Sequence, residues 1–497
     1  MTESKHHEVV VIGAGVCGIY QLYRLLELGI DATVLEAGSD LGGTWYWNRY
    51  PGARFDSESY SYSYSFSDEL LQEWDWSERF ASQPETLRYL SCVAGKFNLR
   101  EHMQFDCRVK SAVFDESRSV WKVSLKDGRS LTSNILLTAI GMLSTPTLPN
   151  IEGVSAFQGE SFHTYHWPKE PVELQGKRVG VIGTGATGVQ VIGDIADKVG
   201  SLTVFQRRPN WCAPLKNGPI DAAAMAEIKA SYDEIFEKCK TTPGGFLHGP
   251  DPRHVEEVSE EERREFWEKL YHSPGFGVWL GNYRNVLLEE GANAQYSAFI
   301  ADKIRSRVHD PELAEKLIPR DHGFGTRRVP LETNYYEAYN RDNVRLVDLN
   351  ETPIACITEN GVRTTSEDHE FDLIVYATGF DAITGAFDKI NIEGARGNKL
   401  REKWKEGPIT FLGLQTHGFP NMMTLAGPQG ASVSSNFPRA IEDAVDWATA
   451  FICYLREHGY QRFEPEKEAE ADWLEHVKAG YDMMLLTKTK SWFTGYN

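Results

Sequence analysis

Two stretches of the chain share the same order of apolar and polar positions. Residues 8–37 read as a strand, a glycine-containing turn, an apolar helix near 19–28 and a second strand, and residues 178–206 repeat that order. A strand, a crossover helix and a further strand form the repeating unit of parallel α/β sheets. The chain is therefore predicted to be an α/β protein with two Rossmann-like dinucleotide-binding domains.

The segment after the second unit has a different pattern. Residues 216–322 are rich in Glu, Lys, Arg and Ala, and Ser259 and Glu262 have the spacing of a capping box at a helix start. This predicts a helical insertion, whose charge run over 256–264 is interpreted as a solvated helix face. Strands are expected again over 105–109, 371–379 and 421–430, and a helix with one apolar stripe over 438–458.

Composition and charge exclude several classes of protein. The 497 residues carry a net charge of −19, so the basic surface of a nucleic-acid-binding protein is not expected. No apolar run approaches the roughly 18 residues of a membrane span, and no targeting peptide is recognised, so we expect a cytoplasmic location. The seven cysteines form no CxxC pair and no zinc-like spacing, which argues against a dithiol reductase and against a metal site.

The first glycine turn contains Gly13, Gly15 and Gly18 in the sequence VVVIGAGVCG. Such glycines allow a tight turn, close approach of a pyrophosphate and packing of the helix on the strand. The next strand ends in Glu36, an acidic residue placed to bind the hydroxyl groups of a ribose. Strand, turn, helix and acid together predict a dinucleotide site rather than a purely structural turn.

The second glycine turn, VGVIGTGATG, contains Gly183, Thr184, Gly185 and Gly188. It follows an apolar strand and precedes an apolar helix, as the first turn does. A second dinucleotide site is predicted here, with the phosphates at the helix N-terminus.

The two sites differ at the position of the acidic residue. Glu36 lies 23 positions after the first glycine of its motif, and the same offset in the second motif gives Gln206, followed by Arg207 and Arg208. A carboxylate would repel a 2′-phosphate, whereas guanidinium groups bind one. We therefore predict FAD at the first site and NADPH at the second; the alternative is that these arginines are only surface charges after a strand.

A third motif lies between the two glycine turns. The sequence FQGESFHTYHWP contains Phe157, Gly159, His163, Trp167 and Pro168. It resembles the complete FxGxxxHxxxWP signature of the type I Baeyer–Villiger monooxygenases, and among these the phenylacetone and steroid monooxygenase branch. N-oxygenating flavin monooxygenases share the Phe, Gly and His but typically lack the final Trp-Pro.

This resemblance extends over nearly the whole chain and implies roles for individual residues. The segment 42–56 resembles the family's second signature, and DLIVYATGFD resembles the third. The resemblance implies that Arg328 is the active-site arginine and that Asp56 orients it. It further implies cofactor contacts for Thr44, Trp45, Asp56, Tyr62, Val109, Arg327, Arg328 and Trp492, and substrate contacts for Ser432, Val433 and Ser434.

The family's domain organisation and chemistry follow as expectations. Residues 1–142 and 380–497 should form the FAD domain, and 143–215 with 323–379 the NADPH domain. The implied reaction converts a ketone, bulky aryl or cyclic, to an ester or lactone with dioxygen through a flavin C(4a)-peroxide. A permanently charged arginine suits a developing anion. The alternatives are an N- or S-oxygenating flavin monooxygenase and a redox-sensing protein that binds NAD(P)H and FAD without oxygenating a substrate. The oligomeric state stays open.

Overall fold

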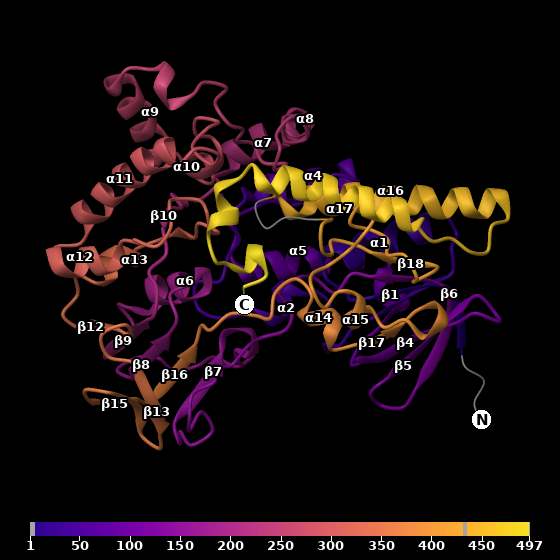
Figure 1. Cartoon of the computed structure of the whole chain (residues 1–497), viewed down its shortest axis with the longest axis horizontal. Coiled ribbons are helices and arrows are strands. Elements are labelled where there is room, and N and C mark those ends of the chain that lie inside the picture. The colour runs from indigo at the N-terminus through magenta and orange to yellow at the C-terminus, as the bar shows by residue number, and fades with distance from the viewer. Residues whose placement is uncertain (1–4, 431–434, 497) are drawn as a thin grey trace.

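The first sheet forms one lobe of the molecule. The structure, a computed structural model, describes residues 5–430 and 435–496. Two sheet-containing lobes lie side by side (Figure 1). In the first sheet a parallel group around β1 continues into an antiparallel group, β4, β5 and β6. Its strand order is β17 (Asn391–Glu393), β4 (Val109–Asp115), β5 (Val120–Leu125), β6 (Ser130–Thr138), β1 (Lys5–Ile12), β2 (Ala32–Leu35) and β3 (Met103–Gln104), with β18 (Met422–Thr424) on β6.

Two long helices pack together beside this sheet. Helix α1 (Val16–Glu27) follows the first glycine turn and contacts α16 (Phe437–His458). The predicted stripe of α16 is buried, with Pro438 in its first turn and Gly459, at φ 70°, ending it in the left-handed conformation. The lobe also contains α5 (Gln83–Lys96) and α17 (Lys467–Asp482). The stripe residues are Ile441, Val445, Ala448, Ile452 and Leu455.

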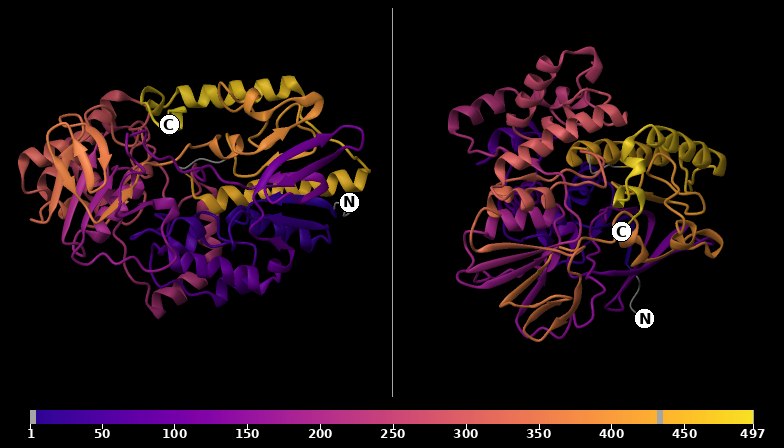
Figure 2. Two further views of the ribbon diagram at one scale, coloured as in Figure 1. Left: turned by 90° about the horizontal axis from the view of Figure 1, so that it is seen from below. Right: turned by 60° about the vertical axis from the view of Figure 1, so that its left-hand side comes forward.

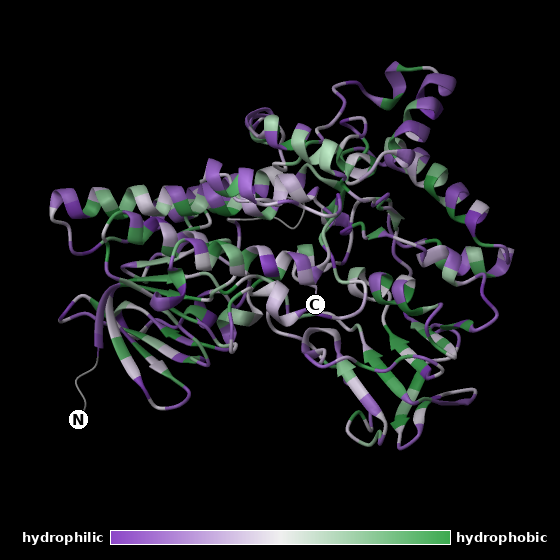
Figure 3. Cartoon of the chain, turned by 180° about the vertical axis from the view of Figure 1, so that it is seen from behind, coloured by the Kyte–Doolittle hydropathy of each residue, from purple (hydrophilic) through white to green (hydrophobic). Residues whose placement is uncertain are grey.

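The second lobe is built on a fully parallel sheet. The predicted unit appears as β8 (Arg178–Ile182), α6 (Ala186–Ile195) and β9 (Ser201–Gln206). The sheet is completed by β12 (Val344–Asp348), β16 (Leu373–Tyr376) and β7 (Glu160–His163), in the order β12-β9-β8-β16-β7. Apolar residues fill both faces, as expected for a covered parallel sheet, and the strands in Figure 3 are largely apolar. A small antiparallel sheet is formed by β13 (Ile354–Thr358), β14 (Gly361–Thr364) and β15 (Asp368–Glu370).

The insertion is helical, as predicted, and extends from the second lobe (Figures 1 and 2). Strands β10 (Ala213–Pro214) and β11 (Leu331–Glu332) pair at its two ends. The Ser259 side chain accepts a hydrogen bond from Glu262 N, which caps α9. The helices are α7 (Ala222–Ala230), α8 (Tyr232–Lys240), α9 (Glu260–His272), α10 (Gly277–Leu280), α11 (Glu290–Arg307) and α12 (Pro311–Leu317).

Short helices complete the architecture. These short helices are α2 (Thr44–Trp47), α3 (Ser59–Tyr62), α4 (Asp68–Glu73), α13 (Tyr335–Ala338), α14 (Gly385–Asp388) and α15 (Leu400–Lys403). Among the described residues, no helix is long and apolar enough to cross a membrane.

One predicted strand is wrong. Residues 105–108 are not extended, because Asp106 has φ 55° and the chain turns there to hydrogen-bond with Gly38 and Glu36. The strand begins only at Val109.

Candidate active site and cofactor sites

Close backbone contacts explain the first glycine turn. Gly13 has φ 106°, and a Cβ atom on it would lie 2.5 Å from the carbonyl oxygen of Ala139. A Cβ atom on Gly18 would overlap the carbonyl oxygen of Gly13. Helix α1 therefore packs directly on the turn, and its N-terminal N–H groups face the space beside Gly15.

Glu36 lies at this turn and is 5% exposed. Its carboxylate accepts hydrogen bonds from Ala14 N at 2.8 Å and Gly38 N at 2.6 Å. Burial raises the pKa of this carboxyl, and the two backbone bonds counteract the shift. Glu36 thus stabilises the turn itself, a structural role that sequence reasoning missed, and its ribose contact stays a prediction.

The second glycine turn repeats the steric arrangement but is more open. Gly183 has φ 109°, and a Cβ atom on Gly188 would overlap the Gly183 carbonyl oxygen. A Cβ atom on Gly185 would meet no atom within 4 Å. Open space at the start of α6 fits a pyrophosphate. The Thr184 hydroxyl donates to the carbonyl oxygen of Arg208 at 2.9 Å, which ties the turn to the end of β9.

Three arginines gather beside the second turn. Arg207 and Arg208 are exposed, and Arg327 pairs with Asp321 at 3.2 Å. Burial lowers the pKa of Arg327, and the nearby Arg208 and Arg207 contribute in the same direction. This concentration of positive charge fits a 2′-phosphate, which would relieve the repulsion.

Gln206 lies beside these arginines but faces elsewhere. It is 1% exposed, and its side-chain amide donates to the carbonyl oxygen of Lys316 at the end of α12. Comparison of the two glycine motifs correctly showed that the second has no acid at the position of Glu36. The Gln206 side chain that replaces it connects the sheet to the insertion.

The fingerprint motif covers both faces of the second sheet. Phe157 packs in the core on one face and Trp167 in the core on the other. A Cβ atom on Gly159 would lie 2.5 Å from the Phe157 ring, so the glycine makes room for it. Nε2 of His163 donates to the carbonyl oxygen of Gly379 at 3.1 Å, and Nδ1 accepts from Tyr165 N. Pro168 lies at the surface beyond Trp167.

His163 is expected to make stability depend on pH. Burial lowers its pKa from 6.5 to about 4. As the pH falls through 6.5 the unfolded chain binds this proton first, so stability is complete above pH 6.5 and is lost between 6.5 and 4. The expected loss is about 2 kcal/mol by pH 5. A His163→Asn variant should lose less stability than the wild type between pH 7 and pH 5 in urea unfolding; equal losses would contradict a buried neutral imidazole.

Asp56 and Arg328 meet between the two lobes. Nη2 of Arg328 lies 2.8 Å from Oδ1 of Asp56, although 272 residues separate them in the sequence. The guanidinium carbon lies 4.5 Å from the ring centroid of Phe276 and 5.7 Å from that of Trp279. Nη1 of Arg328 also donates to the carbonyl oxygen of Val329 at 2.8 Å. A cation held by a carboxylate, a carbonyl oxygen and two aromatic rings is fixed in direction, yet its side chain is 20% exposed, so a reactant can reach it.

Phe276 and Trp279 are the residues of this site that sequence reasoning missed. They come from the start of α10 in the helical insertion, which had been interpreted only as a separate helical unit. The signal available was a cluster of glycines and aromatics, PGFGVW, within an otherwise charged segment.

The remaining predicted site residues lie in several places. The Trp45 indole donates to the Tyr62 hydroxyl at 3.0 Å, and Tyr62 stacks on Phe55. Thr44 is exposed and begins α2. Val109 is buried at the start of β4. Trp492 lies in a short 3₁₀ turn, Trp492–Thr494, and Ser432, Val433 and Ser434 lie outside the described residues.

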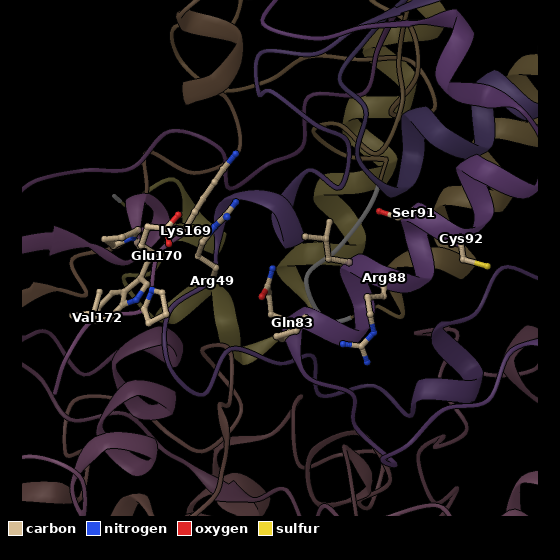
Figure 4. A pocket seen from close by; sticks show the side chains of 13 residues that line it. Arg49, Gln83, Arg88, Ser91, Cys92, Lys169, Glu170 and Val172 are labelled. Carbon is tan, nitrogen blue, oxygen red and sulfur yellow. The ribbon is translucent and has the colours of Figure 1, made fainter. Parts of the chain in front are cut away.

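Two further features of the described residues are a cavity and a group of potential metal ligands. A cavity of about 780 Å³ lies between α5 and residues 167–172, which begin with Trp167 and Pro168 of the fingerprint, and Arg49, Arg88 and Lys169 line its walls (Figure 4). In the insertion, His254, Glu256 and Glu289 bring one potential ligand atom each within 4.8 Å of one another, but Arg284 donates to Nε2 of His254. A guanidinium in this position disfavours a cation.

Comparison with known proteins identifies the family of this chain. A model of the family Flavin-binding monooxygenase-like matches residues 6–217. The chain is 46% identical over 492 residues to 2-oxo-Delta(3)-4,5,5-trimethylcyclopentenylacetyl-CoA monooxygenase of Pseudomonas putida, covering 98% of this chain and 90% of that protein. It is 39% identical over 498 residues to Phenazine N-monooxygenase PhzNO1 of Lysobacter antibioticus, covering 100% and 91%.

Solved structures agree along almost the whole chain. OTEMO in complex with FAD and NADP superposes with a TM-score of 0.96 at 46% identity, covering 99% of this chain and 93% of that one. Oxidized steroid monooxygenase bound to NADP gives a TM-score of 0.96 at 45% identity, covering 99% and 94%.

The fold and its two glycine turns define a flavoprotein monooxygenase with separate sites for two dinucleotides. The chain belongs to the Baeyer–Villiger monooxygenases of the flavin-binding monooxygenase-like family, and its cofactors are FAD and NADPH.

Proposed function

We propose that this enzyme converts a cyclic or bulky aryl ketone to a lactone or ester, with Arg328 as its catalytic residue. The observation that carries the assignment is the Asp56–Arg328 ion pair, framed by Phe276 and Trp279 where the two lobes meet. A 2-oxo-cyclopentenyl compound gives the Pseudomonas putida relative its name, which supports the ring-containing class.

The cofactors divide between the lobes in this proposal. FAD lies on the first sheet, with its ribose at Glu36, and NADPH lies on the second, with its 2′-phosphate at Arg207, Arg208 and Arg327. FAD supplies electron transfer from NADPH to dioxygen when bound. Residues 485–489 contact the other lobe through Leu485 N to Leu287 O and Thr489 to Thr326. The proposed FAD domain, 1–142 and 380–497, therefore contacts the rest of the chain through its last residues.

The protein residues act mainly by charge and position. Arg328 neutralises the negative charge that develops on the ketone oxygen as it is attacked, because a guanidinium keeps its charge throughout. Asp56 fixes the direction of the guanidinium by accepting from Nη2. We propose that Trp45 and Tyr62 contact the flavin ring, and their mutual hydrogen bond keeps both side chains in place.

A substrate screen tests the proposal. NADPH oxidation is measured with cyclic and aryl ketones and with N-heterocycles, and product mass is read for a gain of one oxygen atom. Ketone-stimulated oxidation with ester or lactone formation supports it. Oxygenation of the N-heterocycle alone would favour the second candidate function, N-oxygenation. The 39% identity to a phenazine N-monooxygenase is the observation that supports this candidate.

Coenzyme preference is expected to depend on Arg207. Its exposed guanidinium has no partner among the described residues, so it is free to bind the 2′-phosphate. Arg207→Ala should raise the KM for NADPH about 10- to 100-fold, since a hydrogen bond to a charged group contributes about 1.5–3 kcal/mol. The KM for NADH should change little. Arg341→Ala, on the same lobe, is the control, and equal shifts for both coenzymes would refute the assignment.

A further inference from the structure

A hydrogen bond between a buried glutamate, Glu58, and the half-buried His248 joins the segment after Asp56 to the helical insertion. Glu58 is 3% exposed, and its Oε1 lies 2.7 Å from Nε2 of His248. Since a carboxylate accepts, the imidazole donates. The two residues are 190 positions apart in the sequence, and neither belongs to a glycine turn or to the fingerprint.

The pair packs against the backbone on both sides of Phe276. A Cβ atom on Gly275 would lie 2.8 Å from Oε1 of Glu58 and 3.3 Å from Nε2 of His248. A Cβ atom on Gly277 would lie 3.3 Å from Nδ1 of His248. Both glycines therefore leave room for the imidazole, and the position of His248 determines where the Phe276 backbone can lie.

Phe276 transmits this position to Arg328. Its ring centroid lies 4.5 Å from the guanidinium carbon, and the same guanidinium pairs with Asp56. The contacts thus form a closed circuit, from Asp56 through Arg328 and Phe276 to His248 and Glu58. A single residue, Ser57, lies between Glu58 and Asp56 and completes the circuit.

The Glu58 end of the circuit is firmly held. Its carbonyl oxygen accepts from Ser61 N and Tyr62 N at 3.0 Å, which starts α3. The next residue, Ser59, is fully buried and donates from its backbone N–H to the carbonyl oxygen of Arg79. Because this end cannot move freely, loss of the hydrogen bond should release the insertion loop instead.

We propose that Glu58 and His248 are positioning residues for oxygenation. Their hydrogen bond holds the Gly275–Gly277 backbone so that the Phe276 ring stays against Arg328 and limits the guanidinium to orientations that also satisfy Asp56. The proposal rests on the proposed function, in which Arg328 carries the chemistry. The pair acts through Gly275–Gly277 and the Phe276 ring, the contacts that it makes within the protein.

The test separates positioning from a general loss of structure. His248→Ala should lower the amount of ester formed per NADPH oxidised about tenfold, while the KM for NADPH stays within twofold of the wild type. His248→Gln, whose amide can still donate to Glu58, should restore most of the yield. His272→Ala, which removes a histidine with a 62% exposed side chain from the same insertion, is the control.

A double-mutant cycle supplies a readout that does not depend on turnover. Glu58→Ala and His248→Ala should each lower the melting temperature. The double variant should lower it by less than the sum of the two single effects, because the same hydrogen bond is lost in all three proteins. If the alanine variants do not fold, His248→Met, which preserves bulk without a donor, replaces His248→Ala in both measurements.

Two outcomes would overturn the proposal. The first is an unchanged ester yield in folded His248→Ala, or in His248→Met where that variant replaces it. The second is an ester yield of His248→Gln that equals the yield of the variant without a donor. Failure of the proposed function is measured separately, in the wild-type enzyme. If a ketone does not stimulate NADPH oxidation by the wild type, the proposed function is refuted, whatever the His248 variants show.

Discussion

Glu36→Arg is expected to yield a protein that has lost FAD but still binds NADPH. The wild-type carboxylate is nearly inaccessible and accepts from Ala14 N and Gly38 N. The arginine would place a cation beside two N–H donors and remove both acceptors. It would also remove the acceptors that we propose for the FAD ribose hydroxyls. Since a charge-assisted bond contributes about 1.5–3 kcal/mol, loss of two such bonds to the ribose should weaken FAD binding by about two orders of magnitude or more. Flavin absorbance per mole of purified protein measures the effect.

Glu36→Gln is the matched control for this experiment. It keeps one acceptor oxygen and nearly the same volume, so it should retain more FAD than Glu36→Arg. Circular dichroism establishes that both variants are folded, and titration with NADPH measures the second site. A fully flavinated Glu36→Arg protein with impaired NADPH binding would mean that the two sites are reversed.

Local patterns predicted the fold because its main elements are determined locally. The glycine turns at Gly13 and Gly183 need positive φ angles and close backbone contacts, requirements that few other residue types meet. The stripe of α16 from Ile441 to Leu455 is similarly local, since helical spacing places these residues on one face. Both patterns are visible in one sequence, although the backbone oxygens that crowd Gly13 and Gly183 belong to Ala139 and Ala377, far along the chain.

The surroundings of the candidate site were not predictable in this way. Phe276 and His248 come from the insertion and reach Arg328 and Glu58 only through tertiary packing. No periodicity links positions 58 and 248. Gln206 shows the same limit, since its residue type was interpreted correctly but its bond to the Lys316 carbonyl depends on where α12 ends.

The family resemblance supplied the pairing that spacing could not. Asp56 and Arg328 are 272 residues apart, and composition gives no reason to join them. The structure brings the two side chains to 2.8 Å. Their roles in the reaction, like those of the other site residues, stay predictions that substitutions must test.

Arg328→Ala should abolish ester formation in a protein that still folds and holds FAD. The Arg328 side chain is 20% exposed and packs its guanidinium on Phe276 and Trp279, so its removal opens no fully buried cavity. Its removal leaves the charge on the attacked carbonyl without a counter-charge, which commonly costs about two to three orders of magnitude in rate. NADPH oxidation should continue slowly, with its electrons released as hydrogen peroxide. Chromatography of the ester and a peroxide assay on the same reaction measure both products.

The replacement series at this position distinguishes charge from geometry. Arg328→Lys keeps the charge but not the planar fork that reaches Asp56 and lies over Phe276, so it should recover only part of the rate. Arg327→Ala, one residue away, should instead raise the KM for NADPH, because Arg327 belongs to the cluster beside the second glycine turn. If Arg328→Ala converts a good ketone substrate at nearly the wild-type rate, the catalytic cation must be sought elsewhere. A loss of equal size in Arg327→Ala without a change in KM would show that the two neighbouring arginines do not have separate tasks.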